Sequence, residues 1–280
     1  MRRHRFEGAG KVKLADISEE PPEGVSKHDA KDRFEELSKE IFELQDWMWG
    51  ARTHSLLVIL QGRDAAGKDG AVKHMSGAFN PRGVVVTSFG VPTEEELEHD
   101  FLWRVHRQAP RAGRISIFNR SHYEDVLAVR VKDLAPKSVW KERYALINAF
   151  ERTLAAANVI ILKFFLHISK DEQEKRLLAR EQNPADAWKL SIEDWKDRER
   201  WEEFTEAYED AIARCASPDA PWIVVPADAK WYRNLVVTEA VAAALRPHRK
   251  SWRKKLDEEG KVLRRDVEEW RRRAEKGGRG

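Results

Sequence analysis

The sequence predicts one α/β domain, built on a parallel five-stranded sheet with helices on both faces. Short, dense apolar runs alternate along the chain with longer segments whose apolar residues recur at helical spacing. The apolar runs are too short for typical helices and are rich in Val, Ile and Leu, as in strands that are buried on both faces. One of them, residues 55–60, leads directly into a glycine-rich turn and a further helical segment. This order of elements favours βαβ units and therefore a parallel sheet.

The sequence also predicts where the individual helices and strands lie. Residues 1–25 are polar and contain two prolines and several glycines, so we expect an extended arm. Ser26 can cap a helix that runs to about Trp49. Capping boxes at Thr93 and Ser169 each predict the start of another helix. The remaining strands are expected at 84–89, 115–118, 159–166 and 222–225. The helices are expected at about 93–107, 123–131, 138–156, 169–181, 191–214, 231–245 and 250–276.

These elements predict three parts of the chain. The arm over 1–25 precedes a domain over 26–245, in which a helical segment after the fourth strand, about 167–200, has the place of a lid. A polar tail over 246–280 follows, with 14 basic and 7 acidic residues. This tail can be a mobile arm, a helix that packs between subunits, or a solvated helix, and we favour the last.

Composition excludes several classes of protein. The chain has 280 residues and a formal net charge of only +3, although charged residues make up 35% of it, so no broad basic surface for nucleic acid is expected. Cys215 is the single cysteine, which excludes an internal disulfide and favours a reducing, cytoplasmic location. No apolar run approaches the roughly 20 residues of a membrane span, and the N-terminus lacks a signal-peptide core.

The most specific motif is the glycine-rich turn after residues 55–60. It reads GRDAAGKDG and matches the phosphate-loop pattern G-x-x-x-x-G-K between a predicted strand and a predicted helix. Backbone N–H groups of such a loop form a nest for an anion, and the lysine bridges phosphate oxygens. The phosphate-binding positions are expected to be Gly62, Arg63, Ala65, Ala66, Gly67, Asp69 and Gly70.

Two carboxylates make this loop unusual. Asp69 stands where Ser or Thr normally follows the lysine and holds Mg²⁺, and Asp64 lies inside the loop. Asp64 can hold Mg²⁺ or orient an acceptor phosphate, because Mg²⁺ sites use one or two carboxylates plus phosphates. Both residues can alternatively cap the loop or the helix. We favour a functional role for Asp64 and leave both interpretations open for Asp69.

The third predicted strand ends in a cluster of polar groups, FNRSHYED, at 118–125. Ligands of open α/β sheets bind beyond the carboxyl ends of the strands, so this tip and the loop are expected to meet. Together with SFGVPTEEELEHDFLWRVHR and PWIVVPADAKWYRNLVV, these motifs resemble the family-2 polyphosphate kinases, in collinear order over roughly residues 28 to 245. The form FNRSHYE resembles the class that phosphorylates nucleoside mono- and diphosphates.

The resemblance implies a P-loop kinase fold like that of thymidylate and adenylate kinases, with a helical lid. It implies reversible phosphoryl transfer from inorganic polyphosphate to AMP or ADP, and a homo-oligomer as the assembly. If the tail over 246–280 is a mobile arm, it would gather polyphosphate. We expect the reaction to depend on Mg²⁺, with Mn²⁺ as an alternative ion. From the charge and the apolar runs we expect neither nucleic acid nor a membrane as a partner. Other classes carry Asp where this chain has Asn119, and Asn where it has Glu124. The metal role therefore moves to Asp64.

Physical roles follow for the charged residues. Lys68 is expected to hold the transferring phosphates, and Arg120 to pair with a phosphoryl group, because a guanidinium matches phosphate in two hydrogen bonds. Glu124, four residues on, can orient Arg120, bias the choice of acceptor, or form a simple ion pair with it. With Asp64, these are the expected catalytic residues. The expected polyphosphate- and nucleotide-binding residues are Lys73, Arg104, Arg107, Asn119, Tyr123, Arg176, Arg180 and Arg198.

Three other functions share part of this pattern. An ATP-dependent nucleoside or small-molecule kinase can use the same loop. A nucleotide-binding switch or nucleic-acid ATPase would draw support from the basic tail, but such proteins usually have Ser or Thr in place of Asp69 and an acid in place of Asn119. A non-catalytic binding protein is the third.

Overall fold

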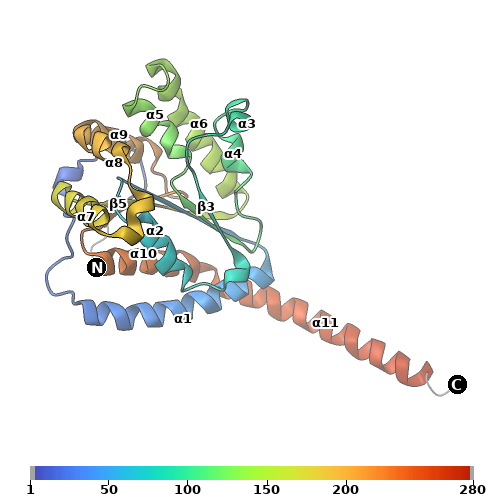
Figure 1. The fold of residues 1–280 in the computed structure, drawn as a ribbon. Coiled ribbons are helices and arrows are strands. Elements are labelled where there is room, and N and C mark those ends of the chain that lie inside the picture. Colours follow the sequence, from blue (N-terminus) through green and yellow to red (C-terminus); the bar gives the residue numbers. More distant parts are fainter. Residues whose placement is uncertain (1–3, 278–280) are drawn as a thin grey trace.

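The computed structural model describes residues 4–277 and has a central sheet between two layers of helices (Figure 1). The first three residues of the expected arm and the last three of the expected tail lie outside the described part. The strands are β1 (His4–Phe6), β2 (Ser55–Gly62), β3 (Val84–Ser88), β4 (Ile115–Asn119), β5 (Val159–His167) and β6 (Trp222–Pro226). Their order in the sheet is β1-β6-β5-β2-β4-β3.

The five predicted strands are all present and parallel to one another. A sixth strand, which the sequence did not predict, comes from the arm: β1 pairs antiparallel with β6, with His4 opposite Val224 and Phe6 opposite Trp222. This strand has only three residues and its partner lies more than 200 residues away. No local pattern could therefore reveal it.

Every residue of β2 is buried, because helices cover both faces of the sheet. Leu56, Val58 and Leu60 belong to one apolar core, with residues of α1 (Lys27–Ala51), α2 (Lys68–Ser76) and α10 (Lys230–Leu245). Leu57 and Ile59 belong to the other, with α6 (Lys137–Ala156) and α9 (Trp201–Cys215). Successive side chains of a strand point to opposite faces, and this places the end of β2 between two rigid layers.

Three predicted helices are shorter or divided. The helix expected over 93–107 consists of α3 (Glu94–Leu97) and α4 (Trp103–His106), since Asp100 accepts a hydrogen bond from the Leu102 N–H and starts a new turn. The helix expected from Ser191 is divided at Arg200 into α8 (Ile192–Glu199) and α9. The region 123–131 contains the 3₁₀ turn η3 (His122–Asp125) and α5 (Ala128–Val131).

The segment expected to form the lid contains α7 (Lys170–Gln182), the 3₁₀ turn η4 (Pro184–Lys189) and α8. Ser169 caps α7 through the Glu172 N–H, as predicted. The Glu172 carboxylate binds Arg176. The chain ends in α11 (Arg249–Gly277), which starts against α1 and extends away from the sheet (Figure 1). The remaining 3₁₀ turns are η1 (Leu14–Asp16), η2 (Pro81–Gly83) and η5 (Arg246–His248). Within residues 4–277, no helix is both long and apolar enough to cross a membrane.

Candidate active site

The glycine-rich loop joins the end of β2 to the start of α2, as the motif requires. Ala65 and Gly67 both have a left-handed backbone, with φ of 59° and 93°. Gly67 is the N-cap of α2, and a Cβ atom there would lie 2.1 Å from Nη1 of Arg233. Only glycine fits this position, because it tolerates the conformation and leaves room for the guanidinium.

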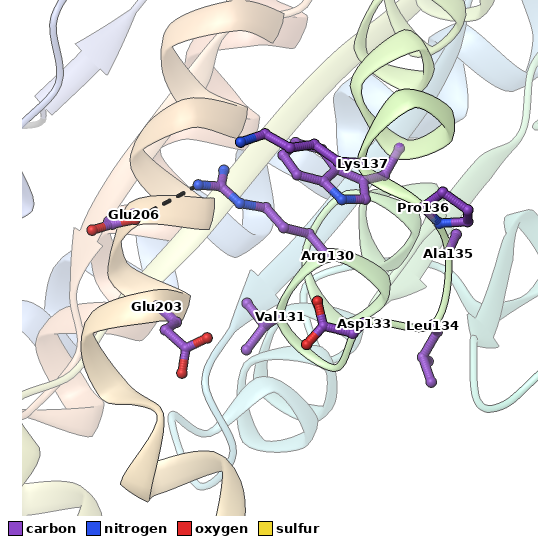
Figure 2. A pocket seen from close by; sticks show the side chains of 10 residues that line it. Arg130, Val131, Asp133, Leu134, Ala135, Pro136, Lys137, Glu203 and Glu206 are labelled. Carbon is purple, nitrogen blue, oxygen red and sulfur yellow. Dashed lines mark ion pairs between the residues drawn. The ribbon is translucent and has the colours of Figure 1, made fainter.

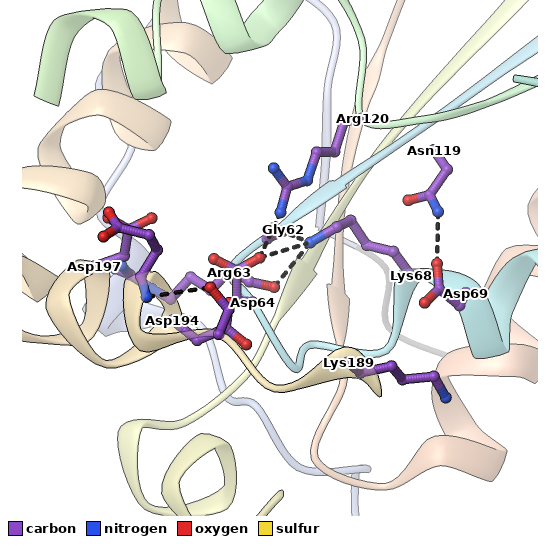
Figure 3. Close-up of polar contacts among 12 residues, drawn as sticks. Gly62, Arg63, Asp64, Lys68, Asp69, Asn119, Arg120, Lys189, Asp194 and Asp197 are labelled. Carbon is purple, nitrogen blue, oxygen red and sulfur yellow. Dashed lines mark hydrogen bonds and ion pairs between the residues drawn. The ribbon is translucent and has the colours of Figure 1, made fainter. Parts of the chain in front are cut away.

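Lys68 folds back over the loop that precedes it. Its Nζ donates to the carbonyl oxygens of Gly62 (2.7 Å) and Arg63 (3.0 Å) and lies 4.0 Å from Oδ1 of Asp64 (Figure 3). Burial lowers the pKa of Lys68, although the neighbouring carboxylate of Asp64 opposes this shift. The ammonium group therefore lies in a desolvated position where its charge acts strongly on a bound phosphate.

An ion pair joins the loop to the tip of β4. Nη2 of Arg120 donates to Oδ1 of Asp64 at 2.6 Å. Arg120 has a left-handed backbone with φ of 62°, an uncommon conformation that occurs at functional sites. Burial disfavours the charge of Asp64, but Lys68 and Arg120 outweigh it and hold the pKa of Asp64 below its usual range. Asp64 is thus an ionised carboxylate between two cations.

Asp69 and Asn119, the two departures from the common loop pattern, contact each other. Nδ2 of Asn119 donates to Oδ1 of Asp69 at 2.6 Å (Figure 3). Oδ1 of Asn119 is buried and has no hydrogen-bond partner among residues 4–277. The acid after the lysine and the amide at the strand tip therefore form one unit, which offers an unused oxygen.

Glu124 lines a small cavity together with Asp64 and Arg120. The side-chain amide of Gln61 forms hydrogen bonds to both of its neighbours in one orientation. In that orientation the Gln61 nitrogen donates to Oε1 of Glu124 at 3.0 Å, and the Gln61 oxygen accepts from Ser121. Burial raises the pKa of Glu124, against the opposing charges of Arg120 and Lys68. Among the described side chains no ion pair within 4.0 Å joins Glu124 to Arg120. The small cavity that Glu124 lines has a volume of about 60 Å³, and Lys132, Asp197 and Tyr208 also line it.

An open cleft of about 720 Å³ lies above the loop. Its walls are the loop, the ends of β3 and β4, the segment from α7 to α8, and the start of α10. Of the predicted binding residues, Asn119, Arg176 and Arg180 line it. Three basic residues line it that the prediction did not include: Lys189, Lys230 and Arg233. Lys230 and Arg233 follow β6; their strand-end position is visible in the sequence, but from the sequence we assigned them a structural role.

Arg176 and Arg233 meet at the loop. Arg176 donates to the carbonyl oxygens of Ala65 (3.1 Å) and Ala66 (3.2 Å), and to those of Ala227 and Asp228 (both 2.8 Å). Gln173, also on α7, donates to the Asp64 carbonyl oxygen. Burial and the charge of Arg176 lower the pKa of Arg233 to about 10. The guanidinium groups of Arg176 and Arg233 thus lie near each other and have little contact with solvent.

The structure places several predicted residues outside the large cleft. Lys73 and Arg107 are exposed, and Arg107 stacks on Trp103. Arg104 is buried and donates to the Gly90 carbonyl oxygen at 3.0 Å. Arg198 donates to Lys170 O and to Gln173 and Glu174, so it holds α8 against α7.

Arg63, a predicted loop residue, also turns away from the cleft. Its guanidinium lies 3.7 Å from the centre of the Trp201 ring and donates to the hydroxyl of Thr205. It borders the small cavity beside Glu124. Arg63 therefore anchors the loop to α9.

Tyr123 belongs to a buried polar network beneath the tip of β4, which the sequence did not reveal. Nζ of Lys163 donates to Oε2 of Glu151 (2.5 Å), to the Tyr123 hydroxyl (2.9 Å) and to the Cys215 carbonyl oxygen (2.5 Å). The Tyr123 hydroxyl in turn donates to Oε1 of Glu151 at 2.9 Å. Burial opposes the charge of Glu151, but Lys163 lowers its pKa. The network fixes the turn that carries Arg120 and Glu124.

Lys163→Met should lower the free energy of unfolding by about 3–5 kcal/mol, because it leaves the buried Glu151 carboxylate without its cation. Urea denaturation measures this loss. Lys163→Met combined with Glu151→Leu removes both charges and should recover part of the stability. If the single variant is as stable as the wild type, the ion pair does not support the turn.

A second hollow of about 550 Å³ lies between the loop after α5 and helix α9 (Figure 2). Arg130 extends into it, but pairs with Asp210 at 2.7 Å and Glu206 at 3.7 Å. Its guanidinium also lies 5.0 Å from the Trp140 ring. The cation of Arg130 therefore already has two carboxylate partners in this hollow.

Comparison with known proteins supports the family resemblance that the motifs indicate. The model of the family described as polyphosphate kinase 2 (PPK2) matches residues 24–253. An AMP/ADP-polyphosphate phosphotransferase of Meiothermus ruber is 46% identical over 247 residues, which is 88% of this chain and 92% of the relative. An ADP-polyphosphate phosphotransferase of Rhodopseudomonas palustris is 39% identical over 252 residues, 84% of this chain and 87% of the relative.

A solved structure agrees with the fold as well. The crystal structure of polyphosphate kinase 2 from Arthrobacter aurescens has a TM-score of 0.82 and 41% sequence identity, and the match covers 86% of this chain and 87% of that one. The predicted α/β architecture is therefore confirmed, both by the described sheet and by this similarity.

Proposed function

Because the chain belongs to the polyphosphate kinase 2 family, we propose that it transfers phosphoryl groups between inorganic polyphosphate and AMP or ADP, in both directions. The observation that carries this proposal is the convergence of Lys68, Arg120, Arg176 and Arg233 on one cleft at the start of α2. Donor and acceptor are both polyanions, so their mutual repulsion is the main obstacle to reaction. Cations and helix-start N–H groups reduce it.

The buried Arg233 and the partly buried Arg176 support an anion at the helix start. The position of a Cβ atom on Gly67 lies 2.1 Å from Nη1 of Arg233 and 3.6 Å from Nη1 of Arg176. Burial, and after it the charge of Arg176, lowers the pKa of Arg233, and an anion beside the guanidinium would favour its charged form. We assign a phosphate of the substrates to the part of the cleft beside these two guanidinium groups.

Lys68 and Arg120 are assigned to the transferring phosphoryl group. An oxygen of the acceptor phosphate forms a new bond to the terminal phosphorus of polyphosphate, and the bond from that phosphorus to the rest of the chain breaks. Negative charge spreads over the oxygens of the transferring group, where a preorganised ammonium and guanidinium stabilise it. Asp64 keeps Arg120 in place at 2.6 Å.

Kinases of this kind generally use a divalent metal ion, and we propose Mg²⁺, with Mn²⁺ as a substitute. Among the described residues, no group of three or more His, Cys, Asp or Glu could form a metal cage. Mg²⁺ needs none, since one or two carboxylates plus phosphates suffice. The contacts of Asp64 with Arg120 and Lys68 both involve Oδ1. Asp64 and the unused oxygen of Asn119 would hold the ion, which neutralises phosphate charge.

An ATP-dependent nucleoside or small-molecule kinase is the competing function. The test is to give the purified protein AMP or ADP, Mg²⁺ and polyphosphate, with no other phosphoryl donor. We expect ADP and ATP to form. If neither forms, while ATP phosphorylates a nucleoside, the competing function is correct. We place the reaction in the cytoplasm, since the single cysteine suits a reducing compartment.

Glu124→Asn should change the preference between AMP and ADP. The carboxylate borders both Arg120 and the small cavity, so its loss alters the charge and the space beside the acceptor phosphate. The measurement is kcat/KM for each acceptor, with Glu124→Gln as the control that preserves side-chain length. Identical ratios in the wild type and Glu124→Asn would refute this role.

A further inference from the structure

Helix α11 leaves the body of the protein after its first two turns. Trp252 is fully buried and Leu256 packs against the core beside α1. Beyond them, every residue from Lys261 to Glu275 is exposed, and the helix projects far beyond α1 (Figure 1). The match to the family model ends at residue 253, so the shared catalytic function does not account for this projecting part.

The projecting helix is exposed, as a solvated helix is, but it is not uniformly polar. One side carries small or apolar residues at alternating spacings of four and three: Leu256, Gly260, Leu263, Val267, Trp270 and Ala274. Leu263, Val267 and Trp270 are 64%, 48% and 69% exposed. This heptad spacing is typical of helices that pair with another helix.

We propose that this stripe pairs with the same stripe of a second copy of the chain, antiparallel, about a two-fold axis near residue 265. Charge supports this orientation. The helix carries three acidic residues at 257–259, three basic at 261–265, three acidic at 266–269 and three basic at 271–273. Antiparallel pairing centred on 265 places each block opposite one of the other sign. A parallel in-register pair would place like blocks side by side.

The packing within the body also favours the antiparallel arrangement. The side of α11 that carries Leu256 is already in contact with the body of its own chain, where Leu256 approaches the position of a Cβ on Gly50 to 2.7 Å. A parallel second helix would run into α1 at this point. An antiparallel helix reaches the contact between Leu256 and α1 only with its end. It therefore covers the exposed part of the stripe and leaves the part that is buried against α1 unchanged.

Side-chain size agrees with the same register. It places Trp270 of one copy opposite Gly260 of the other, and Leu263 opposite Val267. A Cβ atom at Gly260 would meet only the guanidinium end of Arg264, at 3.7 Å. Glycine inside a helix lowers the stability of the helix by about 1 kcal/mol relative to alanine. An indole that packs against Gly260 needs the space that a side chain there would fill, which explains a glycine at this position. The contact is self-complementary and closes as a dimer.

Val267→Glu tests the interface, with Val262→Glu as its matched control. Both valines lie on α11 and are about half exposed, at 48% and 49%, but Val262 lies off the stripe. We expect Val267→Glu to halve the mass measured by sedimentation equilibrium, Val262→Glu to keep the wild-type mass, and kcat to stay unchanged in both. A wild-type protein that is monomeric, or a Val267→Glu variant of wild-type mass, would overturn the proposal.

Disulfide trapping tests the orientation independently. Leu263→Cys and Val267→Cys are mixed, allowed to exchange subunits and oxidised; the native Cys215 is buried. We expect a cross-linked dimer in the mixture and little in either variant alone. Efficient cross-linking of Val267→Cys by itself would show a parallel pair and refute the antiparallel register. No cross-link in any sample would refute the contact. Turnover is measured separately, so neither result depends on the proposed phosphoryl transfer.

Discussion

Lys68→Ala is expected to reduce kcat by at least about 1,000-fold, because one preorganised cation at a phosphoryl-transfer centre contributes that much. In the structure its ammonium is buried and lies 2.7 Å from the Gly62 carbonyl oxygen and 4.0 Å from Asp64. No other lysine has this position in the loop. Steady-state assays with polyphosphate and ADP, at saturating concentrations of both, measure the effect.

Lys73→Ala is the matched control for that variant. Lys73 lies on the same helix, five residues further on, but it is exposed and does not line the cleft. We expect its activity to stay within a few-fold of the wild type. If both variants lose activity equally, charge at the helix as a whole matters and the specific position of Lys68 does not. Unchanged turnover in Lys68→Ala would refute its role altogether.

Asp64→Asn should lower kcat by several orders of magnitude. Asparagine preserves the shape of the side chain, but removes the charge that pairs with Arg120 and Lys68 and that would hold the metal ion. The assay is repeated over a range of Mg²⁺ concentrations, because loss of a ligand raises the concentration required. A loss smaller than about tenfold, or roughly 1.4 kcal/mol of barrier, would mean that Asp64 only caps the loop.

Asp69→Asn separates the two loop carboxylates. The Asp69 carboxylate accepts a hydrogen bond from Asn119, and an amide can still take part in that contact. The Asp69→Asn variant should therefore lose much less activity than the Asp64→Asn variant. Equal losses would indicate that the loop needs both negative charges.

The sheet could be predicted because each of its parallel strands is a dense apolar run between turn residues. The phosphate loop could be predicted because its glycines, its lysine and its place after a strand are all local features. The strand β1 could not, since three residues paired with a distant strand leave no periodic signal. The division of the helix expected over 93–107 was missed because Asp100 restarts a helical turn within an otherwise continuous pattern.

Only part of the candidate site could be predicted, because local motifs reveal some of its residues and tertiary packing decides the others. Asp64, Lys68 and Arg120 belong to motifs at strand ends, and the structure brings them together. Arg104 also appeared suitable for binding phosphate, but its guanidinium binds a backbone oxygen inside the protein. Arg233 was not selected, because its position over Gly67 depends on how α10 packs against α2. Charge can be read from a sequence, whereas the partner of each charge depends on the tertiary structure.

The most direct test of the proposed function follows the phosphorus atom itself. Polyphosphate labelled with ³²P is incubated with unlabelled ADP, Mg²⁺ and the wild-type protein, and the products are separated. We expect the label in the γ-phosphate of ATP, with one phosphate lost from polyphosphate for each ATP formed, and none with Lys68→Ala. Label that appears only as inorganic phosphate, or ATP that forms without label, would contradict direct transfer in this cleft.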